Sequence, residues 1–231
     1  MHSCYRYLAS VLLLFFNAGV TYAEVVMPEQ FGMHLHGLAR GSSWPSVNFG
    51  FIRLWDTGTN WSHIEPYKGQ WNFKDLDRYV DTAHEKKVKV LMTLGQTPQW
   101  AALNPAAESP YSPGASSPPK DILDWRNYVR TLAERYKGKI THWEVWNEVD
   151  VKHFYSGDMK TLVVLERAAA EVLKSVDPAN VVLTPSVQSG AFGKLDAFFG
   201  GWWPGLRCSQ LPFLRSERRS RGGSSFCKKR T

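Results

Sequence analysis

The sequence predicts an α/β fold with a parallel sheet, in the form of an incomplete (β/α)8 (TIM) barrel of about five βα units. Three observations lead to this prediction. Short apolar, β-branched runs alternate along the chain with stretches of helical period. A helix between successive strands implies parallel pairing, and right-handed crossovers then favour a barrel. No glycine-rich phosphate loop follows the first strand, which weakens the alternative of an open doubly wound sheet.

Five stretches have the composition expected of buried strands. Each is rich in bulky and β-branched residues and ends at polar residues or glycine. In chain order, the predicted strands are residues 31–36, 49–56, 88–95, 142–148 and 181–187.

Three amphipathic stretches predict helices between these strands. Apolar residues recur at helical spacing over residues 76–83, 125–136 and 162–176, and Asp177-Pro178 ends the last of them. No helical pattern is clear between the first two strands. The Pro- and Ser-rich residues 104–119 predict a long loop after the third strand, and in a barrel that loop lies on the catalytic face.

The first 23 residues are typical of a secretory signal peptide. Arg6 supplies positive charge, residues 8–16 form a short apolar run, and Thr21-Tyr22-Ala23 places small residues before a cleavage site. The mature chain would begin near Glu24 and be secreted or periplasmic, with a partial catalytic domain over residues 24–199. We expect no membrane association after signal removal, because no other stretch is hydrophobic enough to span a bilayer.

The last residues differ from the rest in charge. Residues 1–200 are balanced, so the whole net charge of +7 lies in residues 201–231. This distribution argues against a nucleic-acid partner and predicts a disordered basic tail over residues 200–231. A frameshift between about residues 199 and 206 is a second interpretation. Codons for residues 206–215 can be chosen so that the next frame encodes Tyr-Asp-Val-Val-Ser-Tyr-His-Phe-Tyr, and the nucleotide sequence decides between the two.

The types and spacing of the residues that could carry chemistry argue against a metal or cofactor site. Cysteine occurs at Cys4, Cys208 and Cys227 and nowhere in the body between, and no Cys/His cluster has metal-ligand spacing. We therefore expect no cofactor and no metal. Ten tryptophans are compatible with sugar stacking, although packing in the core explains any single one equally well.

Glu148 is the strongest catalytic candidate. It follows Trp146 and Asn147 at the end of the fourth predicted strand, where a barrel presents its functional groups. Desolvation among tryptophans would raise the pKa of this carboxyl and suit it to act as a general acid. Asn147 could bind a sugar 2-hydroxyl. The alternative is that Glu148 merely begins a loop.

Several other residues are candidates for substrate binding. Arg53 lies within an apolar strand, where a cation needs a partner, either a functional carboxylate or a structural one such as Asp56. His34 and His36 share one side of the first strand, so His36 could face the barrel mouth or be structural. Trp100 could stack on a sugar or pack in the core, and Trp146 is also assigned to substrate binding.

As an ordered set, these motifs resemble the clan A glycoside hydrolases, nearest to the β-xylosidase and α-iduronidase type family or a cellulase-like relative. The match covers about residues 31–195. It rests on Phe51-Ile52-Arg53-Leu54-Trp55, Trp61-Ser62-His63-Ile64-Glu65-Pro66, Gly69-Gln70-Trp71-Asn72-Phe73, Leu76-Asp77, Gly95-Gln96-Thr97-Pro98-Gln99-Trp100 and Trp146-Asn147-Glu148.

The resemblance implies a retaining glycosidase that acts on oligosaccharides, polysaccharides or glycosides by double displacement. Glu148 would be the acid/base, Asn147 the 2-hydroxyl contact, and Arg53 a neighbour of the nucleophile. In such enzymes the nucleophilic Glu ends strand seven, whereas five strands are predicted here. We therefore expect the acid/base half alone. The alternatives are a catalytically inactive truncated product, a weak glycan-binding protein, or a half-barrel completed by another chain.

Overall fold

The computed structural model describes residues 27–188 and 190–202. The signal peptide predicted at residues 1–23 lies outside the described residues. So do residues 203–231, which hold most of the predicted basic tail and its proposed alternative frame. The domain limits at residues 24 and 199 therefore stay predictions.

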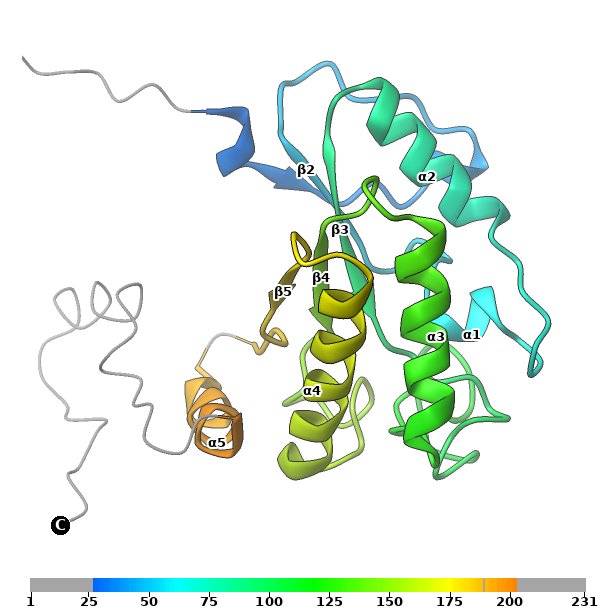
Figure 1. Ribbon diagram of the computed structural model, residues 1–231, viewed down its shortest axis with the longest axis vertical. Coiled ribbons are helices and arrows are strands. Elements are labelled where there is room, and N and C mark those ends of the chain that lie inside the picture. The colour runs from blue at the N-terminus through cyan, green and yellow to red at the C-terminus, as the bar shows by residue number, and fades with distance from the viewer. Residues whose placement is uncertain (1–26, 189, 203–231) are drawn as a thin grey trace, which may run out of the picture.

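Five parallel strands form one sheet in chain order, which confirms the predicted α/β class (Figure 1). Neighbouring strands of the sheet follow one another along the sequence, as they do around a (β/α)8 barrel. The strands are β1 (Gly32–Met33), β2 (Phe51–Leu54), β3 (Lys89–Leu94), β4 (His142–Val145) and β5 (Val181–Leu183).

The three predicted helices form and cover one face of this sheet (Figure 1). Asp121 caps the helix before β4 by accepting a hydrogen bond from the Leu123 amide, and Asp158 caps the next from the Thr161 amide. The helices are α2 (Lys74–Glu85), α3 (Ile122–Arg135) and α4 (Met159–Val176), with the short α1 (Trp61–Ile64) before them, α5 (Phe192–Trp202) after β5, and 3-10 turns η1 (Pro28–Gln30) and η2 (Leu38–Arg40).

The two faces of the sheet have different chemistry because strand side chains alternate. The helix-facing residues are apolar and almost fully buried: Ile52, Leu54, Val90, Met92, Leu94, Trp143 and Val145. The opposite face corresponds to a barrel interior and carries polar groups. Thr93 and Glu144 lie side by side on it, as register partners on β3 and β4.

The strands are shorter than the sequence predicted because the backbone leaves the extended conformation at their C-terminal ends. Asp56, Gln96 and Trp146 all have φ between 57° and 71° just after β2, β3 and β4. Left-handed residues cannot continue a ladder, so each predicted run divides into a strand and a bent tip. The helix α5 was not predicted as an element of its own.

Candidate active site

The tip of β4 is a bent segment with unusual backbone geometry. Trp146 and Glu148 have φ of 71° and 45°, on either side of Asn147. Left-handed residues of this kind cost about 1–3 kcal/mol each and persist only where the surroundings hold them. The Trp146 amide donates to the Leu94 carbonyl at 2.7 Å, and its indole Nε1 donates to the Phe154 carbonyl at 2.7 Å. Both contacts anchor the tip.

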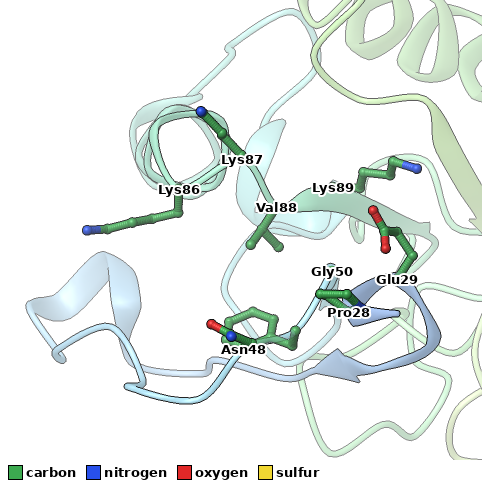
Figure 2. Close-up of a pocket in the computed structure, with 9 residues that line it drawn as sticks. Pro28, Glu29, Asn48, Gly50, Lys86, Lys87, Val88 and Lys89 are labelled. Atoms are coloured by element: carbon green, nitrogen blue, oxygen red, sulfur yellow. The ribbon is translucent and has the colours of Figure 1, made fainter. Parts of the chain in front are cut away.

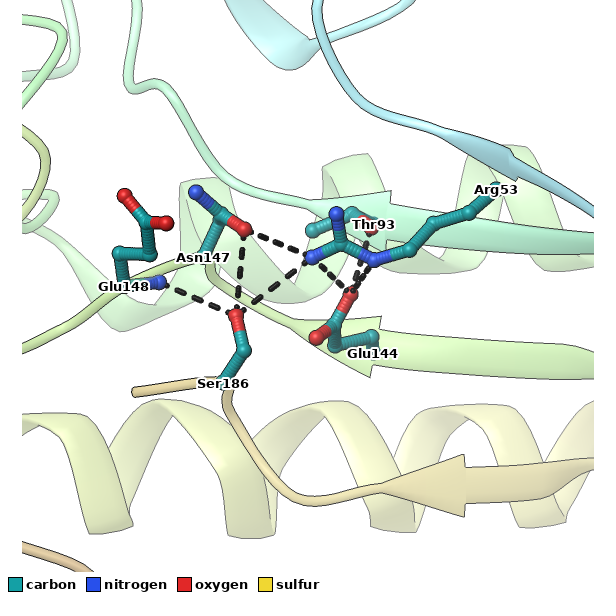
Figure 3. A network of polar contacts seen from close by, with 6 residues as sticks. All are labelled: Arg53, Thr93, Glu144, Asn147, Glu148 and Ser186. Atoms are coloured by element: carbon teal, nitrogen blue, oxygen red, sulfur yellow. Dashed lines mark hydrogen bonds and ion pairs between the residues drawn. The ribbon is translucent and has the colours of Figure 1, made fainter. Parts of the chain in front are cut away.

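Arg53 lies at the centre of the polar network beneath this tip (Figure 3). Its Nε donates to Glu144 Oε2 at 2.8 Å, and its Nη2 lies 2.7 Å from the same oxygen. The Thr93 hydroxyl donates to that oxygen at 2.7 Å. Burial raises the pKa of Glu144, while the Arg53 charge and these hydrogen bonds lower it. The structural alternative for Arg53 named Asp56 as its partner, whereas the ion pair is to Glu144.

Asn147 and Ser186 extend this network to the end of β5. Arg53 Nη2 donates to Asn147 Oδ1 at 2.8 Å, and the Ser186 hydroxyl donates to the same oxygen at 3.1 Å. The Glu148 amide in turn donates to Ser186 Oγ at 3.1 Å. In Figure 3 the Glu148 carboxylate and the Asn147 amide nitrogen point away from Ser186 on the same side. The ends of four strands thus meet at this point.

A cavity of about 360 Å³ opens above this network at the C-terminal ends of the strands. It contains four of the predicted site residues, with both carboxylates on the tips of β2 and β4. The lining residues are His34, His36, Arg53, Trp55, Asp56, Asn147, Glu148 and Phe154. This cavity can bind a polar, hydroxyl-rich ligand, because its wall combines carboxylates, imidazoles, an amide and aromatic side chains.

Nearby groups set the charge of the cavity wall. Burial and then the Arg53 charge lower the pKa of His34, so this imidazole is neutral at pH 7. Its ring lies 5.8 Å from that of His36 in an edge-to-face arrangement. Burial raises the pKa of the Tyr111 phenol, as does its hydrogen bond to Asp56. Tyr111 comes from the long loop after β3, so that loop packs against Trp55 and Phe154, two of the lining residues.

Two of the predicted residues lie outside the cavity. Trp146 has no exposed surface and packs edge-on against Tyr155, with ring centroids 5.0 Å apart. Its indole therefore supports the tip from below. Trp100 is partly buried, donates to the Glu65 carbonyl at 2.9 Å and carries Lys68 over its ring. A substrate contact for either residue stays a prediction.

Sequence reasoning missed Glu144, Ser186 and Thr93. Alternation along the fourth strand could have shown that Glu144 faces away from the helices, because its neighbours Trp143 and Val145 are apolar. The cation of Arg53 then required such a partner. Ser186 gave no comparable signal, because a serine after a strand is common. No group of three His, Cys, Asp or Glu residues in the described part of the chain could hold a metal ion.

A second cavity, of about 240 Å³, lies at the opposite end of the strands (Figure 2). Its rim includes Lys86, Lys87 and Lys89, but Figure 2 shows that these three side chains diverge rather than converge on one point. The rest of the lining includes Gly50 and Val88. This cavity lacks the convergent polar groups of the first one, so the cavity at the Glu148 end is the better candidate site.

Comparison with known proteins agrees with this geometry. A model of the glycosyl hydrolases family 39 matches residues 48–196. The chain belongs to this family. The match confirms the resemblance to clan A glycoside hydrolases that the motifs indicated.

Two bacterial xylanases are similar to part of this family 39 chain. Endo-1,4-beta-xylanase A of Caldicellulosiruptor sp. (strain Rt8B.4) is 33% identical over 91 residues, covering 37% of this chain and 13% of the xylanase. Endo-1,4-beta-xylanase A of Halalkalibacterium halodurans is 28% identical over 95 residues, covering 37% and 24%. The chain thus spans less than a quarter of the length of these relatives.

Solved structures of family 39 enzymes have the same fold over a larger share of the chain. The GH39 β-xylosidase of Caulobacter crescentus superposes with a TM-score of 0.58 at 21% identity, covering 73% of this chain and 42% of that one. The GH39 enzyme of Xanthomonas axonopodis pv. citri gives 0.52 at 27% identity, covering 66% and 32%. The five-stranded sheet is therefore a partial TIM barrel.

Proposed function

We propose that this chain serves the hydrolysis of O-glycosidic bonds by a retaining double displacement, with Glu148 as the acid/base. The observation that carries the proposal is the joint position of Glu148 and Asn147 at the mouth of one cavity, on the bent tip of β4. Family membership supports a carbohydrate substrate. Xylan-type glycosides are the first to test, since the similar proteins are named as xylanases and a β-xylosidase.

The chemistry assigns each group a role. Glu148 donates its proton to the glycosidic oxygen and the C–O bond breaks as a carboxylate attacks the anomeric carbon; in the enzymes that this chain resembles, that carboxylate follows strand seven. In the second step Glu148 accepts a proton from water, which displaces the enzyme carboxylate. Asn147 donates to the 2-hydroxyl, a contact that strengthens as the oxocarbenium-like transition state forms. Arg53 keeps Asn147 in place through its 2.8 Å hydrogen bond.

An assay on an aryl β-xyloside and an aryl β-glucoside tests this role. Glu148→Gln should lower kcat about 10²-fold or more, because general acid–base catalysis contributes about 10²- to 10⁴-fold. Glu108→Gln is the matched control, since Glu108 is an exposed loop carboxylate with 86% of its side chain accessible. Measurable wild-type turnover that is unchanged in Glu148→Gln would exclude Glu148 as the acid/base.

Azide gives a second, independent test. In Glu148→Ala, azide can attack the glycosyl-enzyme without base assistance, so turnover of an activated aryl glycoside should rise with azide and yield a glycosyl azide of retained configuration. An inverted product would contradict double displacement.

The second candidate function is glycan binding without turnover. One observation favours it: the carboxylates that line the cavity among the described residues are Asp56 and Glu148, from the tips of β2 and β4. In the enzymes that this chain resembles, the nucleophile follows strand seven. Calorimetric titration with xylo-oligosaccharides, alongside the aryl glycoside assay, separates the two functions, since binding without product formation favours this one.

Export is the third part of the proposal. Residues 1–23 have the three regions of a secretory signal. None of the helices in the described part of the chain has the length and hydropathy that a membrane crossing needs. N-terminal sequencing of the expressed protein should give a first residue near Glu24, and an uncleaved Met1 in an export-competent host would argue against it.

A further inference from the structure

Ser186 forms hydrogen bonds with the proposed catalytic tip through both its side chain and its backbone. It follows β5 and has no sequence motif of its own. Its hydroxyl donates to Asn147 Oδ1 at 3.1 Å and accepts the Glu148 amide at 3.1 Å, with Arg53 Nη2 at 3.5 Å (Figure 3). Its carbonyl accepts the Val149 amide at 3.1 Å. One residue thus contacts three consecutive residues of the tip.

These contacts determine which end of the Asn147 amide faces the ligand. Asn147 Oδ1 accepts from both Arg53 Nη2 and Ser186 Oγ, so both of its acceptor positions are used. The Ser186 oxygen accepts the Glu148 amide and its one proton is donated to Asn147 Oδ1, with the Glu144 carboxylate as a second nearby acceptor. A flipped amide would place an NH2 group against the Arg53 guanidinium. The Asn147 nitrogen is therefore turned away from the network, as Figure 3 shows.

The same residue also holds the backbone on which Glu148 is presented. Glu148 has φ of 45°, a conformation that a glutamate rarely adopts without support. The Glu148 and Val149 amides both donate to Ser186, one to its hydroxyl and one to its carbonyl. The end of β5 therefore fixes the bend at the end of β4.

We propose that Ser186 is a positioning residue that orients the Asn147 amide as a hydrogen-bond donor toward a sugar 2-hydroxyl oxygen. The inference rests on the proposed function of Asn147 and Glu148, and it adds that the donor is selected by a residue of the neighbouring strand. The ligand class is a glycoside with a free oxygen at C2.

The first test compares two substrates in three variants. Aryl β-xyloside and its 2-deoxy analogue are assayed with wild type, Ser186→Ala, Ser186→Thr and the control Ser175→Ala, whose hydroxyl bonds to the Val172 carbonyl within α4. Ser186→Ala should reduce the preference for the 2-hydroxyl substrate in kcat/KM about tenfold, consistent with loss of one hydrogen-bonding contact. Ser186→Thr should restore it, and Ser175→Ala should leave it unchanged. Equal loss on both substrates would overturn the proposal, because a purely structural role acts on both alike.

The second test does not depend on turnover. The side-chain NH2 of Asn147 is observed by ¹H–¹⁵N correlation NMR and assigned by its loss in Asn147→Asp. Wild type and Ser186→Thr should give one sharp pair of signals, whereas Ser186→Ala should shift and broaden it, because the amide then loses the Ser186 hydrogen bond and is held by Arg53 alone. An unchanged pair in Ser186→Ala would overturn the proposal even if the wild type is inactive. Ser186→Cys, which keeps the volume but donates weakly, replaces Ser186→Ala if the alanine variant does not fold, with the same outcomes.

Discussion

Arg53 is the residue on which the site depends most directly. It comes from β2 and reaches groups on β4 and at the end of β5, so one guanidinium joins three strands. A planar fork with several donors suits this role, whereas the single ammonium of lysine does not. Asn147 therefore depends on Glu144 through Arg53, which bonds to both side chains.

Removal of Glu144 is expected to destabilise the fold and disturb the site. Glu144→Gln should cost about 2–3 kcal/mol of unfolding free energy, because it leaves a cation without its charged partner. This is less than for a fully buried pair, since 19% of the Arg53 side chain is exposed. Urea unfolding measures the loss.

Two further variants make that prediction specific. Glu171→Gln removes a surface ion pair to Arg126 and should cost less than about 1 kcal/mol. Arg53→Met combined with Glu144→Leu should recover most of the stability while still losing Asn147 orientation. A Glu144→Gln cost no larger than that of Glu171→Gln would show that the pair contributes no more than a surface one.

At the scale of elements, the sequence predicted the strands and the three long helices but not the bends between them. Periodicity identifies Val90, Met92 and Leu94 as one buried face, because it depends on local alternation. The left-handed tips at Asp56, Gln96 and Trp146 depend on contacts between strands. None of these three residues is a glycine, so the sequence carries no local signal for a bend there. Ser186 was missed for the same reason, since its partners are distant in sequence.

Gly95, just after β3, lies against the Trp146 ring just after β4. A Cβ at Gly95 would lie 3.1 Å from the Trp146 ring, and φ is 149°, in a region that favours glycine. Gly95→Ala should therefore cost about 2–4 kcal/mol, from overpacking together with backbone strain. Gly138→Ala is the control, because φ there is 76° but no atom lies within 4 Å of the added Cβ. Thermal unfolding should show the smaller loss for Gly138→Ala, and equal losses would exclude the Trp146 contact as the cause.

Helix α4 contains a carboxyl that the site does not use. Glu166 is 4% exposed, and its Oε2 has no hydrogen-bond partner among the described residues. Burial raises the pKa of Glu166 well above its usual 4.5, and the charge of Glu144 raises it further. The folded state thus binds the Glu166 proton more tightly than the unfolded state does.

This shift predicts a pH dependence of stability with a definite sign. An acid whose pKa is raised on folding favours the folded state while protonated. That contribution is complete below about pH 4.5 and is lost as pH rises through the folded pKa, with a slope of at most about 1.4 kcal/mol per pH unit. Glu166→Gln should reduce the slope, because the raised pKa of Glu144 contributes in the same direction, and should be more stable than wild type at pH 8. Urea unfolding at pH 5 and pH 8 tests this, with exposed Glu171→Gln as control, and an unchanged slope in Glu166→Gln would assign it to other groups.

At the scale of the whole molecule, the described sheet is open. β1 pairs with β2 and β5 with β4, and neither pairs with a second strand among the described residues. The interior face shows partly exposed Phe51, Leu91 and Leu183 where a closed barrel would cover them. An edge strand with apolar side chains is a template for pairing with another chain.

The β5 edge should therefore drive self-association of the purified chain. Val181 begins β5 with 44% of its surface exposed, and a lysine there would place charge on the edge, which opposes strand pairing. Val181→Lys should shift sedimentation velocity profiles toward the monomer at concentrations where wild type associates. Val164→Lys is the matched control, because Val164 is a 54% exposed apolar residue on α4, away from the edge. If both variants reduce association equally, general surface hydrophobicity is responsible and the open edge is not.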